Sequence, residues 1–130
     1  MIGKAVYNIL SNASGVTNLI GTRIFPSIAP QGTQHPYSTY RVTNTEMVDT
    51  KANVIPRELP QVQIDVFARS REDAENIAAA IRSALHGYTG TVQGIKIVDT
   101  RIINQNDGTL DADYILHVVS QDYEFRINKL

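Results

Sequence analysis

The stretch ARSREDAE, residues 68–75, joins an alternating polar–apolar segment to a helical pattern, and such a junction binds phosphate in many enzymes. A phosphate site needs exposed backbone N–H groups, usually with glycines that let the anion come close. This stretch has no glycine, and Glu72, Asp73 and Glu75 repel an anion while they stabilise the first helical turn. Ser70 and Asp73 form an approximate capping box. The junction therefore predicts a capped helix start and no anion site.

The residues that could bind a metal ion do not cluster in the sequence. His35, His86 and His117 lie far apart, and none has a second ligand at the spacing that a metal site needs. The segment NQNDGTLDAD, residues 104–113, places its glycine and its acids at the wrong positions for a calcium loop. Its Asp-Gly pair instead predicts a hairpin turn. We expect neither a metal ion nor another cofactor.

Nucleophile motifs are also missing. The chain has no cysteine, and it contains no G-x-S-x-G, S-x-x-K or phosphate-binding Walker motif. Asp65 and Asp99 could form an acid–base pair, but their spacing gives no indication that they meet. We therefore expect no enzyme. A hydrolase that uses Asp65 or His117 is a weaker hypothesis than the two non-enzymatic functions considered below.

Composition describes an ordinary globular domain. The 130 residues are 42% hydrophobic and 19% charged, with a formal net charge of −1, so no global charge attracts nucleic acid or an acidic membrane. The first ten residues lack a signal-peptide core, and no apolar run is long enough to span a membrane. We expect one domain, 1–130, used in the cytoplasm where it is made.

The pattern of apolar residues predicts an α+β fold, with a single mostly antiparallel β-sheet, an N-terminal helix and a second helix at about 70–86 packed on one face. The second helix has an apolar stripe from Ala74 to Leu85 and ends at Gly87. The other predicted elements are a helix at 2–13, a helical turn closed by Gly21, strands at 23–25, 37–43, 61–69, 95–103 and 112–127, and a turn at 104–111.

Two segments do not fit a small core. Residues 44–60 have little pattern and predict a long loop or a loose hairpin, and loops of that length are usually functional or disordered. A strand over 112–127 would reach about 50 Å at roughly 3.3 Å per residue, more than a small core covers. We expect its polar end, SQDYEF, to project or to pair outside its own core.

Acidic residues gather in the last third of the chain, where Arg101 is the only base between residues 99 and 124. These acids are Asp99, Asp107, Asp111, Asp113, Asp122 and Glu124. The segment is either a solvated face or an acidic surface that does not adhere to DNA.

Four motifs resemble the tail-completion proteins of long-tailed bacteriophages, which are also called tail terminators or head–tail joining proteins. They are Arg23–Pro26, Pro36–Tyr40, Val62–Ala68 and Ser70–Ala74. The resemblance covers nearly the whole chain and is strongest over residues 61–85, with Phe67 where tryptophan is common.

The resemblance implies a structural virion protein without catalysis. It implies a homo-hexameric ring at the head-proximal end of the tail, which is assembled in the host cytoplasm and caps the tail tube. The partners would be the tail tube protein and the head–tail connector or stopper protein, with DNA passing through the ring without specific binding and no membrane involved.

A closed ring needs different surface patches to meet on neighbouring subunits. For this interface we expect residues of the 44–60 segment and of the projecting strand, namely Met47, Val48, Val54, Ile55, Leu59, Tyr123 and Phe125. For an acidic channel face we expect Asp107, Asp111 and Asp113. The alternative is a small regulatory or ligand-binding α+β domain without catalysis, which a concave apolar pocket with a few polar groups would favour.

Overall fold

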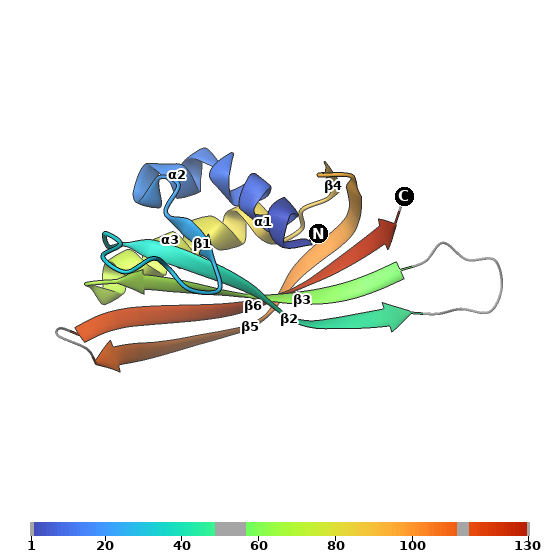
Figure 1. The fold of residues 1–130 in the computed structure, drawn as a ribbon. Coiled ribbons are helices and arrows are strands. Elements are labelled where there is room, and N and C mark those ends of the chain that lie inside the picture. The colour runs from blue at the N-terminus through green and yellow to red at the C-terminus, as the bar shows by residue number, and fades with distance from the viewer. Residues whose placement is uncertain (1, 49–56, 112–114, 130) are drawn as a thin grey trace.

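The computed structural model describes residues 2–48, 57–111 and 115–129 (Figure 1). The elements in chain order are α1 (Ile2–Ser11), α2 (Ser14–Ile20), β1 (Ile24–Pro26), β2 (Tyr37–Val48), β3 (Arg57–Ala68), α3 (Arg71–Leu85), β4 (Gly90–Val92), β5 (Ile95–Asp111) and β6 (Ile115–Lys129).

The strands form one sheet in the order β1-β2-β3-β6-β5-β4. The pairing of β1 with β2 is parallel and the other pairings are antiparallel, so the α+β class is confirmed but the sheet is mixed. Bulges interrupt β2 after Val42 and β5 after Ile97 and Ile102, and bulges increase the local twist of a strand. The sheet accordingly curls, and β4 rises to the level of the helices (Figure 1).

The helices cover one face of the sheet and enclose the core with it (Figure 1). On α3 the predicted apolar stripe is buried, from Ala74 to Leu85, as are the alternate β3 residues from Val62 to Ala68. Because side chains of a strand alternate between faces, the other β3 residues lie on the uncovered side, which we call the open face.

The predicted start of α3 is confirmed. The Ser70 hydroxyl accepts a hydrogen bond of 3.1 Å from the backbone N–H of Asp73, and Gly87 follows the helix with φ of 79°. The predicted helix 2–13 ends earlier, at Ser11, where the Ser11 hydroxyl and the Asn12 amide both donate to the Asn8 carbonyl. Such local hydrogen bonds compete with the continuation of a helix.

The turn predicted at 104–111 is wrong. Residues 104–111 continue β5, and Gly108 pairs with Val118 across a long antiparallel ladder. The Asp-Gly signal is local, and pairing of the whole strand with β6 overrides it.

The expected projection of SQDYEF is also wrong. The segment lies at the centre of the sheet because β6 pairs with β3 on one side and with β5 on the other. Gln121, Tyr123 and Phe125 are fully buried beneath the helices. Residues 44–48 and 57–61, by contrast, pair with each other and lengthen the β2–β3 hairpin.

Candidate assembly surfaces

The residues of the hypothetical hydrolytic site do not meet. Asp65 is level with Ser120 of β6 and Asp99 is level with Arg126, so about 20 Å of strand separates the two carboxylates. Asp65 lies on the open face and accepts hydrogen bonds from Gln63, whereas His117 lies on the helix-covered face beside Arg71 and Ala74. A sheet therefore separates the Asp65 carboxylate from the His117 imidazole.

The histidines take structural positions. The Nδ1 atom of His86 accepts a hydrogen bond of 3.3 Å from the backbone N–H of Ile102, which fixes the end of α3 against β5. His35 packs against Tyr37, and burial together with the nearby Arg69 lowers the pKa of the His35 imidazole. Within the described ranges, no three histidine or acidic side chains group as metal ligands.

The start of α3 is occupied by its own side chains. Arg71 contacts Glu75 and Asp107, each at 3.0 Å, and these contacts raise the pKa of the Arg71 guanidinium. The arginine nearest the first turn is thus already paired with carboxylates, which agrees with a cap and not with an anion site.

The acidic segment is partly neutralised. Glu124 on the open face pairs with Arg101 at 3.1 Å, and Asp122 accepts a hydrogen bond from Asn104. Asp107 is exposed on the helix-covered side of the sheet, where it pairs with Arg71. The side chain of Asp111 and all of Asp113 lie outside the described residues, so the acidic channel face stays a prediction.

The expected interface residues divide into two groups. Tyr123 and Phe125 are each 0% exposed within this chain's own core, so the expectation that they contact a neighbour is wrong. Leu59 is half-buried in the β2–β3 hairpin, while the side chains of Met47 and Val48 and all of Val54 and Ile55 lie outside the described residues. For these residues the interface role stays a prediction.

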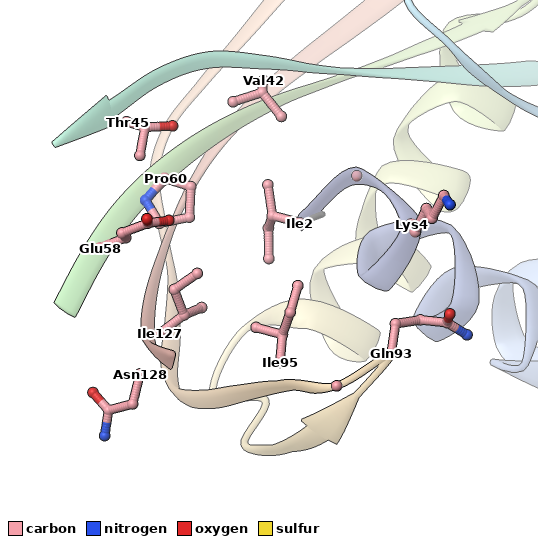
Figure 2. A pocket seen from close by; sticks show the side chains of 12 residues that line it. Ile2, Lys4, Val42, Thr45, Glu58, Pro60, Gln93, Ile95, Ile127 and Asn128 are labelled. Atoms are coloured by element: carbon pink, nitrogen blue, oxygen red, sulfur yellow. The ribbon is translucent and has the colours of Figure 1, made fainter. Parts of the chain in front are cut away.

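An apolar groove opens where the helix-covered face extends beyond α1 (Figure 2). It has a volume of about 960 Å³ and lies between the start of α1, the β4–β5 turn and the far halves of β2, β3 and β6. Its apolar walls are Ile2, Val42, Pro60, Ile95 and Ile127. Glu58 in the same wall is 6% exposed, and Lys4 and Thr45 stand at the rim.

Two long strand edges have no partner strand in the described part of the chain. On β2 the pairing with β1 ends at Tyr40, so Arg41–Val48 bonds only to β3. On β5 the outer edge is covered by β4, by Gly87 at Thr100 and by His86 at Ile102. Beyond Ile102 it pairs only with β6, within the residues described.

Sequence reasoning missed the groove and both edges. The groove residues are ordinary strand and helix positions in the sequence, and only the packing of α1 on half of the sheet leaves them uncovered. The edges follow from the order of the strands in the sheet. Neither the bulges nor the alternation of polar and apolar residues in the sequence indicates that order. In the part of the chain that the structure describes, no helix has the length and apolar character needed to cross a membrane.

Comparison with known proteins identifies the family. The family model for the tail completion protein gp17 matches residues 4–128. The chain belongs to this family. It is therefore a structural protein of a bacteriophage-type tail and a component of the virion, and its family indicates a structural rather than an enzymatic role.

Solved structures share the fold at low sequence identity. A chain in the virion of a native gene transfer agent particle is 17% identical with a TM-score of 0.74, and the match covers 95% of this chain and 92% of that chain. A second solved chain, without a descriptive name, is 18% identical with a TM-score of 0.58 and the same coverage, 95% and 92%. Both show the fold alone. No curated protein sequence matches this chain significantly.

Proposed function

We propose that this tail protein forms a ring, expected to be a hexamer, that closes the head-proximal end of the tail tube and joins it to the head connector. The observation that carries the proposal is membership in a tail-completion family over residues 4–128. The likeness to a chain of a gene transfer agent virion adds support, because that protein also belongs to an assembled particle.

The shape of the chain suits a ring. The β2–β3 hairpin reaches beyond the helices on one side, and the β5–β6 hairpin ends on the opposite side (Figure 1). A ring with cyclic symmetry needs unlike patches where a subunit meets its two neighbours, and a hairpin that projects past the helices can supply one of them. We propose that Leu59, with Met47, Val48, Val54 and Ile55, contacts the neighbour from the β2–β3 hairpin.

The ring would surround a channel through which DNA passes into the tail. We propose that Asp107, Asp111 and Asp113 keep the surface around this channel acidic, because like charge prevents the DNA backbone from adhering. The tail tube protein on one side and the connector or stopper protein on the other are the expected partners.

The test is a deletion of residues 47–55 in the particle-producing system. We expect a soluble, folded chain that no longer forms a ring by mass measurement, and tails that lack heads or have uneven lengths. The matched control replaces the same residues with glycine and serine at unchanged length, which separates loss of side chains from shortening. Normal particles from the deletion would overturn the interface, and a monomeric wild-type chain in finished particles would overturn the ring.

The groove supports a second candidate, a ligand-binding domain. Its volume of about 960 Å³ is within the range of small-molecule sites, and Lys4 and Glu58 supply polar groups beside the apolar walls. If the groove binds a ligand, a small amphipathic compound should raise the melting temperature in a saturable way. The Ile127→Arg substitution should abolish this rise. A melting temperature unchanged across such compounds would exclude it.

A further inference from the structure

We propose that the free edge of β2, residues 41–48, pairs antiparallel with the free edge of β5, residues 103–111, of a second copy of this chain. One β-sheet would then run from subunit to subunit. The inference rests on the proposed ring and deepens it by naming the contact that joins neighbours.

The two edges are long stretches of the described chain whose outward backbone groups have no partner strand, whereas the outermost strands β1 and β4 are only three residues long. A long unpaired edge is a template for another strand, and proteins usually shorten, cover or charge it. Here β5 is covered up to Ile102 by β4, Gly87 and His86, and the covering then stops. The edge of β2 is covered by β1 up to Tyr40, and beyond Tyr40 no described strand other than β3 pairs with β2.

At both edges, the residues whose backbone N–H and C=O groups point away from the sheet can be identified. The Tyr40 carbonyl accepts from the Ser27 N–H at 2.8 Å, and the Thr100 carbonyl accepts from the Gly87 N–H at 2.7 Å, so these residues face out of the sheet edge. Outward and inward residues alternate along an antiparallel strand, and each bulge shifts the alternation by one. Beyond the bulges, Thr45 and Asp107 are therefore outward-bonding.

The two edges also match in the sheet face on which their side chains lie. Thr45 and Asp107 carry their side chains on the helix-covered side, and Asn44 and Asn106 carry theirs on the open face. Pairing the edges in antiparallel register therefore keeps the helices of both copies on the same side of the continued sheet. A one-residue slip would reverse the faces, so the register is defined to within steps of two residues.

Strand direction favours a head-to-tail contact between copies. The strands β2, β3, β6 and β5 are antiparallel in succession, so β2 and β5 run in opposite directions. A copy rotated about an axis roughly along the strands presents its β2 edge antiparallel to the β5 edge of its neighbour. The contact is heterologous, which is the type that builds rings.

One register of this pairing, Asn44 opposite Asn106, is compatible with closure into a ring. Asn44 pairs with Gln61, which in turn pairs with Glu124 of β6, whereas Asn106 pairs with Ser120 of β6. If Asn44 of one copy lies opposite Asn106 of the next, the two copies are therefore staggered by four residues along the strands, about 14 Å. Spread over the four long strands of a subunit, this is one residue of stagger per strand. It corresponds to a strand tilt of about 35°, within the range of closed sheets.

The test uses the absence of cysteine from the chain, which removes any background of disulfides. Asn44→Cys and Asn106→Cys together place thiols at a non-hydrogen-bonded pair of the proposed contact between the β2 edge of one copy and the β5 edge of the next. At such a pair the Cα atoms lie close enough for a disulfide. Under mild oxidation of the assembled protein we expect a ladder of covalent oligomers. Asn104→Cys and Gly108→Cys, each combined with Asn44→Cys, test the registers two residues away.

The controls distinguish the alternatives. Each single-cysteine variant should stay monomeric on a denaturing gel. A dimer from either variant would show that two β2 edges or two β5 edges pair with each other, and would overturn the proposal. A covalent adduct with a different protein at both edges would overturn it too. If the mass shows rings but none of the three double variants cross-links, the edge pairing is wrong and the ring stands. A chain that stays monomeric in particles overturns both.

A second measurement does not depend on oxidation. Thr45→Pro and Thr109→Pro remove an outward N–H at each edge without removing a hydrogen bond inside the chain. We expect both variants to keep their circular dichroism spectrum but to lose the ring, whereas Thr45→Ala and Thr109→Ala keep it. Rings from both proline variants would contradict the pairing.

Discussion

The Tyr123 hydroxyl donates a hydrogen bond of 2.8 Å to the side-chain oxygen of Gln121, inside the core beneath α3. The Gln121 amide nitrogen donates in turn to the Ala78 carbonyl of α3 and to the side-chain oxygen of Gln105 on β5, each at 3.0 Å. The network joins α3 to two strands and gives partners to polar groups whose burial would otherwise destabilise the fold.

Replacing Tyr123 with phenylalanine should therefore destabilise the chain although the ring of the side chain is kept. The substitution leaves the Gln121 oxygen buried without this donor, which costs about 1–3 kcal/mol. Denaturant unfolding measures the difference. The control is Tyr7→Phe, at a position that is 38% exposed, where we expect almost no change. Equal stability of Tyr123→Phe and wild type would mean that the network contributes nothing.

Stability should fall in alkaline solution because of the same residue. Burial raises the pKa of the Tyr123 hydroxyl above its usual value near 10. The neutral form is thus favoured by folding, and its contribution is complete below about pH 10 and decreases as the pH rises further. Melting temperatures at pH 8 and pH 11 measure this loss. In Tyr123→Phe the decrease should be smaller, and an identical decrease would assign it to other groups.

Truncating the buried stripe of α3 should be costly. Ile77 and Ile81 face the sheet with 2% and 0% of their surface exposed, so Ile77→Ala and Ile81→Ala should each lose about 2–5 kcal/mol of unfolding free energy. Glu75→Ala on the exposed face breaks only a surface pair with Arg71 and should change stability by less than about 1 kcal/mol. A melting temperature of Ile77→Ala equal to that of wild type would contradict this packing.

Neutralising the proposed channel acids should impair DNA passage without preventing assembly. In a triple variant with Asp107→Asn, Asp111→Asn and Asp113→Asn, phosphates meet less repulsion and the Arg71 guanidinium loses one carboxylate partner. We expect normal particle numbers but slower DNA release at low salt, restored at high salt where charges are screened. The control is Glu72→Gln. A release rate that is independent of salt in the triple variant would remove these residues from the channel.

The parts of the fold whose signals are local can be predicted from the amino-acid pattern alone. The Ser70 cap, the apolar stripe of α3 and the alternation of β3 were each predicted and each are found in the structure. They are predictable because a helix or a half-buried strand repeats its own contacts every few residues. The resemblance of the motifs between Arg23 and Ala74 to tail-completion proteins was likewise readable, and the family match confirms it.

The pairing of the long strands, by contrast, is visible only in the folded chain. The Asp107-Gly108 signal predicted a turn, yet both residues lie inside β5, and Tyr123 belongs to the core although it was expected at an interface. Whether a strand is central or at an edge depends on which distant strands flank it, and a sequence of alternating residues is compatible with both. The groove and the two strand edges arise in the same way, because they are defined by which of the described elements flank β2 and β5 rather than by the residues of these strands.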